Sequence, residues 1–522
     1  MTVDLLLRGG TVHDGLGSPG RVADVAVAAG RIVGVGRHQG NAAEEVDCDG
    51  LIVAPGFIDA HAHSDLLHLA GEPQTFKLEQ GVTTEICGNC GFSFAPMTAE
   101  AVALLGEAWD ELAGGAEMRP RSFAGYLDEV EAARPANNVA ALVGHHALRT
   151  VANGIDRTLR DGAIDEMRAL AAEAFEAGAI GLSSGLIYVP GTYADTEELV
   201  AIAEVAARYD RPYTTHMRNE GDEVLESLDE AMAIGRRAGV RVQISHCKVA
   251  GLRNHGTATR LLRRIAGGRR EGIDVLGDQY PYTAGSTFLA ALLPPEASEG
   301  GTEALRTRLR DAGERARLRA VAEQGGAGNG LWADAEPHGV LVATHRDGAA
   351  AGCTLAELSG GGDPWDRLCE LVADDPSATI VIELMAEDDV RRIMGDPLVA
   401  VGSDNGPAHG SGHPRTWGCF PRLLGTYVRE QKVLTWEQAI RKMTSLSART
   451  FGLHGRGRLL EGMVADLCVF DPARIGHEGT YLHPDVRPSG VELVTLAGRA
   501  VLRNGQPTGE RAGRVLRGGA AA

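Results

Sequence analysis

The sequence lacks the features that would place it outside the cytoplasm. No apolar run approaches the roughly 20 residues of a transmembrane helix, and the N-terminal stretch MTVDLLLRGGTVHDG has no signal-peptide pattern. Its eight cysteines are scattered over 522 residues, unlike the disulfide framework of a small secreted domain. We therefore expect a cytoplasmic protein that is not associated with a membrane.

Positive charge is also scarce. The chain carries 51 Lys and Arg against 70 Asp and Glu, which gives a formal net charge of −19. This balance argues against binding to nucleic acid or to an anionic membrane surface. An anionic small-molecule substrate would need a local cluster of Arg or Lys. The apolar fraction of 44% and the charged fraction of 23% are ordinary for a globular protein with a large core.

The pattern of the chain differs between its ends and its middle. Short strands with Gly and Asp turns occur near both ends, as in DVAVAAGRIVGVG and VELVTLAGRAVLRNG. We predict one small β-sandwich domain formed by both chain termini, residues 1–56 and 455–522. The middle, residues 57–454, alternates short apolar runs with segments of helical period, which is typical of βα units.

We count eight strand candidates in the middle region: GFIDAH, VTTEIC, VAALVGH, AIGLSS, PYTTHM, RVQISH, IDVLGD and LVAVGSD. Eight βα units predict an α/β fold, a TIM-like (β/α)8 barrel with its chemistry at the C-terminal strand ends. A Gly/Ala- and charge-rich stretch of about 290–378 interrupts the spacing between strands 7 and 8. This insertion either caps the active-site face or forms a peripheral helical excursion.

Potential metal ligands follow several of these strands. His61 and His63 end strand one, and residues two apart on a strand share a face. Strand two is followed by Cys87 and Cys90, which as a redox pair would require a thioredoxin-like helix start. The remaining strand ends supply His216, His246 and Asp404. Thiolate, imidazole and carboxylate together at barrel strand ends favour zinc.

The chain resembles the amidohydrolase superfamily and, within it, the D-aminoacylases, which are N-acyl-D-amino-acid deacylases. The resemblance rests on GFIDAHAHSD, VTTEICGNCGFS, GAIGLSSGLIYVPGTYADTEEL, HMRNEGDEVLESLDEA, ISHCKVAG, YPYTAGST, GSDNGP and HPRTWGCFPRLLG. These segments span nearly the whole chain. Within the superfamily, the resemblance to this particular family rests on three motifs: GNCG, GLIYVPG and HPRTWG.

The resemblance implies how the ligands divide. Cys90 would replace a bridging carboxylated lysine and, with His216 and His246, hold one tightly bound Zn²⁺. A second site, weaker or empty, would be formed by His61, His63 and Asp404. Asn405 follows Asp404 where the resemblance leads us to expect glycine.

The same resemblance assigns the chemistry. Asp404 would accept a proton from water and pass it to the leaving nitrogen, because an amine leaves poorly without one. Lys248 and Arg415 would hold the α-carboxylate of the substrate. Tyr188 and one tyrosine of YPY, Tyr280 in preference to Tyr282, would donate hydrogen bonds.

The expected partner is a small-molecule N-acyl-D-amino acid with a neutral or apolar D side chain. That side-chain preference rests on apolar residues after the seventh strand, in a segment without Arg or Lys: Phe288, Leu289, Leu292 and Leu293. The alternative is that these residues are barrel core and that an arginine such as Arg253 reaches the pocket.

Two other functions compete with this one. Dihydropyrimidinases and dihydroorotases, which act on cyclic amides, use a carboxylated lysine on strand four, where AIGLSSGLIYVPG has none. A non-catalytic barrel would lack ligands, whereas all six candidates are present. The oligomeric state is not predicted.

Overall fold

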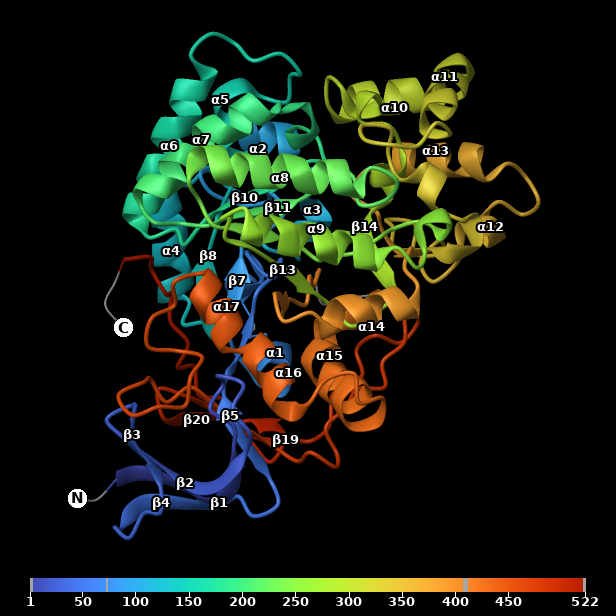
Figure 1. Ribbon diagram of the computed structural model, residues 1–522. Helices are drawn as coiled ribbons and strands as arrows, with labels where there is room; N and C mark the ends of the chain where they lie inside the picture. Colours follow the sequence, from blue (N-terminus) through green and yellow to red (C-terminus); the bar gives the residue numbers. More distant parts are fainter. Residues whose placement is uncertain (1–2, 72–73, 407–411, 520–522) are drawn as a thin grey trace.

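The computed structural model describes residues 3–71, 74–406 and 412–519. Its centre is a barrel of parallel strands surrounded by helices (Figure 1). The barrel strands are β6 (Phe57–Asp59), β7 (Val82–Cys87), β8 (Asn138–Ala141) continued by β9 (Val143–Gly144), β10 (Leu182–Gly185), β11 (Tyr213–His216), β12 (Val242–Ile244), β13 (Val275–Gln279) and β17 (Val399–Val401). The ring closes where the Ala60 amide donates to the Val401 carbonyl at 3.2 Å. The predicted barrel is confirmed.

Helices follow the barrel strands and cover the outside. Those packed around the barrel are α1 (Phe76–Glu79), α2 (Ala99–Leu105), α3 (Asp110–Ala113), α4 (Phe123–Ala132), α5 (His145–Asn153), α6 (Ala163–Ala177), α7 (Thr196–Arg208), α8 (Val224–Ala238), α9 (Ala258–Arg270), α14 (Glu387–Gly395), α15 (Arg415–Arg422), the π-helical η8 (Leu423–Glu430), α16 (Trp436–Met443) and α17 (Ser445–Thr450). None of the helices in the described ranges is long and apolar enough to cross a bilayer.

Helix α8 illustrates why these segments are helical. Its apolar residues recur at helical spacing, and Val224, Leu228 and Met232 are buried against the barrel. Gly239 ends the helix in a left-handed conformation, with φ of 75°, which glycine adopts without steric cost.

The two chain ends meet in one sheet, as predicted. The N-terminal strands are β1 (Val3–Val12), β2 (Arg21–Ala28), β3 (Arg31–Gly36), β4 (Ala42–Asp47) and β5 (Ile52–Pro55), and the C-terminal ones are β18 (Leu467–Phe470), β19 (Val491–Leu496), β20 (Arg499–Arg503) and β21 (Gln506–Pro507). Strands β5 and β18 pair antiparallel and join the two sets. The boundaries at 56 and 455 stay a prediction.

The last part of the described chain leaves this sheet. The Val139 amide donates to the Arg514 carbonyl at 2.9 Å, and the Leu516 amide donates to the Val139 carbonyl at 2.7 Å. Residues 513–518 therefore lie against the start of barrel strand β8 rather than against the small β domain.

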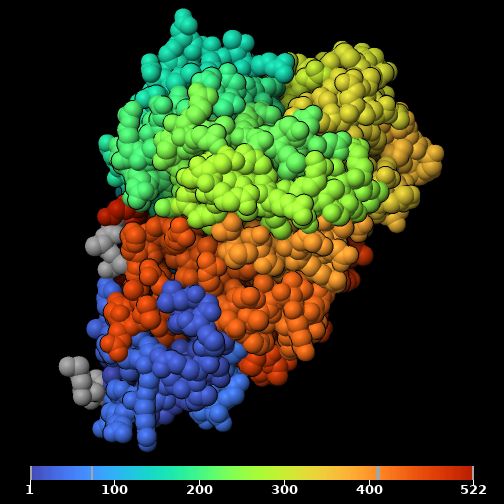
Figure 2. Space-filling view, in the orientation of Figure 1, coloured from blue at the N-terminus to red at the C-terminus, as the bar shows by residue number. Residues whose placement is uncertain are grey.

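Between β13 and β17 the chain forms an insertion with a sheet of its own. Three antiparallel strands, in the order β14 (Ala284–Phe288), β16 (Thr379–Glu383) and β15 (Val340–Thr344), enclose the expected segment at both ends. The α-helices between them are α10 (Thr302–Arg310), α11 (Ala312–Ala322), α12 (Leu355–Leu358) and α13 (Pro364–Asp374). In Figure 2 this insertion, in yellow and light orange, forms a lobe beside the green barrel helices.

Candidate metal centre

All six predicted ligands meet at the C-terminal end of the barrel. They follow or end five different strands, β6, β7, β11, β12 and β17, so the parallel sheet brings distant sequence positions together. Each side chain is buried: His61, His63, Cys90, His216, His246 and Asp404. This convergence is what the strand-end pattern predicts.

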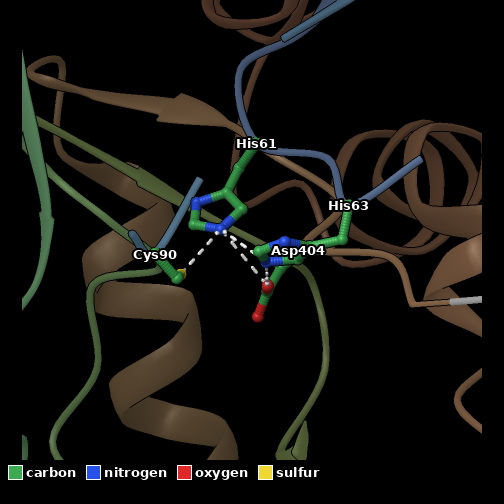
Figure 3. A group of neighbouring side chains, drawn as sticks. All are labelled: His61, His63, Cys90 and Asp404. Atoms are coloured by element: carbon green, nitrogen blue, oxygen red, sulfur yellow. Dashed lines mark hydrogen bonds and ion pairs between the residues drawn. The ribbon is translucent and has the colours of Figure 1, made fainter. Parts of the chain in front are cut away.

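Four of the ligands form one group, drawn in Figure 3. The Nε2 atom of His61 lies 3.3 Å from Nε2 of His63, 3.3 Å from Sγ of Cys90 and 3.3 Å from Oδ1 of Asp404. Nε2 of His63 lies 3.2 Å from the same Asp404 oxygen. The ligand atoms of this group all lie within 4.8 Å of one another.

Cys90 also belongs to a second group with His216 and His246. Its Sγ atom is 3.5 Å from Nε2 of His246, and the rings of the two histidines are 4.4 Å apart. The thiol thus lies between two ligand groups, where a single sulfur can bridge two metal ions.

The spacing suits zinc. Ligand atoms about 2.0 to 2.3 Å from a tetrahedral zinc lie about 3.3 to 3.7 Å from one another, close to the separations above. Both ring nitrogens of His216 are buried without a hydrogen-bond partner among the described residues. A buried polar group without a partner lowers the stability of the fold by about 1–3 kcal/mol, and coordination of a cation would remove this penalty.

The two cysteines of the CxxC segment differ in their electrostatic surroundings. Burial opposes ionisation of Cys90, but the imidazoles of His61 and His246 outweigh it and hold its pKa well below the usual range. Burial, reinforced by Glu85, raises the pKa of the Cys87 thiol well above its usual range. Only Cys90 is therefore poised as a thiolate ligand.

Three of the ligands stand on strained backbone. Cys90, His246 and Asp404 have φ angles of 52°, 34° and 50°, in the left-handed region. That conformation costs a residue with a Cβ about 1–2 kcal/mol and persists where the surroundings impose it. The His246 amide donates to Oδ1 of Asp278 at 2.8 Å, and the Asp404 amide donates to the His61 carbonyl at 2.8 Å. These bonds hold the turns that aim the side chains at the centre.

Two acidic residues beside the centre were not predicted. An oxygen of Glu220 lies 2.9 Å from Nδ1 of His246, and the other lies 3.6 Å from Nε2 of His216. Asp278 lies 3.4 Å from Nδ1 of His61. Carboxylates in this position orient metal-binding imidazoles. The spacing of Glu220, four residues after His216, is the one sequence signal that points to it.

Asn405 belongs to a buried polar network beneath the centre. The Lys77 ammonium donates to Asp59 at 2.5 Å, and to Ser403 and Asn405 at 2.9 Å each. The Asn405 amide in turn donates to Ser64 at 3.0 Å. This network joins the loop after β17 to the loop after β6, and it explains a polar side chain where we expected glycine.

Five of the six candidate ligands, all except His61, line a pocket of about 1030 Å³, counting its open mouth. The four predicted substrate-binding residues line it as well: Lys248, Arg415, Tyr188 and Tyr280. Nζ of Lys248 donates to Glu220 at 2.6 Å, and Nη1 of Arg415 lies 3.0 Å from Asp404. The guanidinium of Arg415 lies 4.6 Å from the centre of the Tyr280 ring. Tyr282 packs instead against Arg422.

The expected side-chain pocket is only partly realised. Of the four apolar residues we predicted there, Phe288 alone lines this pocket, while Leu289 and Leu292 pack in the core. Leu293 borders an adjoining hollow. Arg253 pairs with Asp222 and Asp334 outside the pocket. The apolar wall comes from other parts of the insertion: Leu331, Ile382 and Leu384.

Comparison with known proteins decides the family. The model of the amidohydrolase family matches residues 44–507. A D-aminoacylase of Alcaligenes xylosoxydans xylosoxydans is 39% identical over 98% of this chain and 97% of its own. The chain belongs to the D-aminoacylase family of amidohydrolases. It is a metal-dependent amidohydrolase, and the reading as a non-catalytic barrel is wrong.

Other relatives of this amidohydrolase differ in the substrates for which they are named. An N-acyl-D-glutamate deacylase and an N-acyl-D-aspartate deacylase of the same organism are 38% and 37% identical, over 99% and 98% of this chain and 96% and 95% of their own. Three relatives of nearly equal identity thus bear names that specify glutamate, aspartate or no particular side chain. Overall identity therefore does not discriminate among D side chains.

Solved structures agree with the fold. A crystal structure of D-aminoacylase superimposes with a TM-score of 0.85 at 36% identity, covering 99% of this chain and 100% of that one. A second structure is N-acyl-D-glutamate deacylase from Bordetella bronchiseptica, complexed with zinc and a phosphonate inhibitor. It superimposes with a TM-score of 0.83 at 35% identity, covering 99% of this chain and 100% of that one. Dihydropyrimidinase from Brevibacillus agri superimposes with a TM-score of 0.55 at 18% identity, covering 99% of each chain. A likeness at this low identity shows the fold alone.

Proposed function

We propose that this amidohydrolase hydrolyses N-acyl-D-amino acids to a carboxylate and a free D-amino acid. The observation that carries the proposal is the convergence of a thiolate-containing ligand set and two cationic side chains on one pocket. The D configuration follows the names of the relatives.

We assign one tightly bound zinc to Cys90, His216 and His246. A second ion, weaker or absent, would be held by His61, His63 and Asp404. That one of two ions suffices is supported by a similar D-aminoacylase, whose binuclear centre is described as activated by one metal and attenuated by the second. When bound, zinc supplies Lewis acidity that polarises a carbonyl and lowers the pKa of water toward about 7.

Asp404 is assigned the proton transfers. Burial disfavours its ionised form, but Arg415 and His61 outweigh burial and hold its pKa well below the usual range. The carboxylate therefore stands ready to take a proton from the attacking water. It then returns this proton to the leaving nitrogen, which departs as a neutral amine.

The α-carboxylate of the substrate is assigned to Lys248, Arg415 and Tyr280. Arg415 offers a bidentate fork and Lys248 a compact charge, which together offset the negative field of the chain. Tyr188 is assigned to the carbonyl oxygen. Burial raises its pKa well above the usual range, so its phenol stays protonated and able to donate.

We assign the enzyme a neutral, mostly apolar D side chain. Lys248 and Arg415, the Lys and Arg of the described lining, are already assigned to the α-carboxylate. An acidic side chain would therefore find no surplus Arg or Lys among the described lining residues and would lose its hydration. A Met- or Leu-like side chain would gain about 25 cal/mol per Å² buried against the apolar wall.

The test compares kcat/KM of the zinc-loaded enzyme for N-acetyl-D-methionine, N-acetyl-D-glutamate and N-acetyl-L-methionine. We expect the order D-methionine, D-glutamate, L-methionine, with the L form hydrolysed least. A preference for the glutamate derivative would overturn the side-chain assignment. Hydrolysis of the L form at equal efficiency would overturn the proposed stereochemistry.

A further inference from the structure

A second hollow adjoins the metal pocket. It measures about 830 Å³, counting its open side. Its walls come from the end of helix α2 and the turn after it, the loop after β10 and the start of the insertion. Four side chains, Phe92, Ile187, Tyr188 and Phe288, line both this hollow and the metal pocket. The two spaces therefore share a wall.

The shared wall begins beside the metal ligands. The ring of Phe92 lies 6.2 Å from that of His63, and the ring of Tyr188 lies 5.2 Å from that of His216. Phe92 and Tyr188 are 5.0 Å apart, and Phe288 lies 5.9 Å from Phe92. The aromatic rings nearest the ligands are therefore also rings that border the second hollow.

The second hollow is lined by apolar side chains. Leu104, Leu105, Trp109, Leu293 and Leu305 are among its walls, and none of its described lining residues carries a charge. A carboxylate in this space would lose its hydration without a partner, whereas an alkyl chain would gain burial.

The residues assigned to the amino-acid half of the substrate lie elsewhere in the metal pocket. Lys248, Tyr280 and Arg415 do not border the second hollow. Ile382 and Leu384, assigned to the D side chain, are close to Tyr280, because a Cβ built on Gly285 would lie within 3.9 Å of all three side chains. The α-carboxylate and the D side chain are thus assigned to the part of the metal pocket around Tyr280. The acyl group lies on the other side of the scissile amide and therefore points toward the shared aromatic wall.

We propose that the second hollow receives the alkyl tail of the N-acyl group, so that the enzyme prefers medium-length apolar acyl chains over acetyl. This inference rests on the proposed deacylase function and names the acyl class of its substrate. Each methylene buried in such a space raises kcat/KM by up to about fourfold. Between N-acetyl- and N-hexanoyl-D-methionine we expect a gain of at least about tenfold.

The experiment measures kcat/KM of the zinc-loaded full chain for both substrates, in the wild type and in two filling variants. Ala290→Phe and Ala108→Leu place added bulk on two different walls of the hollow. In each variant we expect the hexanoyl-to-acetyl ratio to fall toward one. Ala349→Phe, at an exposed position of the same insertion that does not line the hollow, is the matched control and should keep the wild-type ratio.

The outcomes separate this inference from the function on which it rests. Hydrolysis of N-acetyl-D-methionine without any gain for the hexanoyl substrate overturns the inference alone. A filling variant that alters the ratio of D-methionine to D-alanine at constant acetyl, and not the acyl ratio, assigns the hollow to the side chain and also overturns it. No hydrolysis of either substrate overturns both.

Discussion

At the scale of single residues, Cys87 at the end of β7 and Cys90 just after it give the sharpest contrast. Cys90 lies within reach of four candidate imidazole ligands, while the buried Cys87 thiol is held protonated. Cys90→Ala should therefore remove the tightly bound zinc and the activity together. Cys87→Ala, the matched control, should spare both. Zinc content by elemental analysis and kcat on one preparation check this, and a Cys90→Ala protein with full zinc content would contradict the assignment.

Asp404 is expected to act mainly in proton transfer. Asp404→Asn removes the titratable oxygen but keeps the size of the side chain, and it leaves Cys90, His216 and His246 in place. The variant should retain one zinc and lose at least about 10²-fold in kcat, the low end of general acid–base contributions. Near-normal kcat in this variant would mean that another group carries the proton.

The convergence of the six candidate ligands could be predicted from the sequence because each lies at or just after a strand end, and a barrel gathers strand ends at one face. Glu220 was missed, because its spacing of four residues from His216 is its one signal and it lies in the charged run RNEGDE, which reads as an exposed loop. Ile382 and Leu384 were missed for a different reason. They lie about a hundred residues after Tyr280 in the sequence, and no local sequence pattern predicts that they line the same pocket.

At the scale of elements, the barrel strands were predictable because strands buried on both faces read as short apolar runs. Strand β14 was not, since AGSTF contains Gly, Ser and Thr and follows directly after YPYT. Its pairing with β16, about ninety residues later, is a long-range contact that periodicity does not reveal. The three-stranded sheet of the insertion was missed for this reason.

One contact between the insertion and the barrel is sensitive to pH. Nη2 of Arg253, in the loop after β12, lies 2.8 Å from Oδ1 of Asp334, in the insertion. Burial raises the pKa of Asp334 to about 6, against the opposing effect of Arg253. Because the folded-state pKa exceeds the unfolded value of about 3.9, the folded protein binds more protons between these two pH values. Its free energy of unfolding therefore falls as the pH rises through about 6.

Thermal unfolding at pH 5.0 and 7.5 measures this effect. From the two pKa values, Asp334 should contribute about 1 kcal/mol of stability at pH 5.0 that is lost at pH 7.5. Asp334→Asn should remove this part of the difference between the two midpoints. Asp222→Asn breaks a contact with the same arginine. Because the Asp222 pKa is lowered and Asp222 ranks after burial among the causes of the raised Asp334 pKa, this control should keep most of the difference. Equal pH dependence in wild type and Asp334→Asn would contradict the argument.

At the scale of the whole molecule, the chain ends hold the two parts together. The small β domain needs both termini, because β5 and β18 pair across it. After the last strand of this domain, residues 513–518 run along barrel strand β8 and form backbone hydrogen bonds with Val139. Since β8 carries none of the six ligands, this contact supports the barrel without touching the site.

A chain ending at Ala512 tests that role. It loses two backbone hydrogen bonds to Val139, one from Gly513 to Pro135 and one from Gly518 to Gly178, as well as the Arg517–Asp128 ion pair at 2.6 Å. At about 1 kcal/mol for each backbone hydrogen bond, and little for an exposed pair, we expect a loss of about 4 kcal/mol in the free energy of unfolding. The midpoint of thermal unfolding should fall, while kcat/KM at a temperature where the chain is folded stays near that of the full chain. Arg499→Ala removes only an exposed ion pair with Glu510 and should leave the midpoint unchanged. A truncated chain that keeps its midpoint but loses activity would show instead that the tail acts on the site.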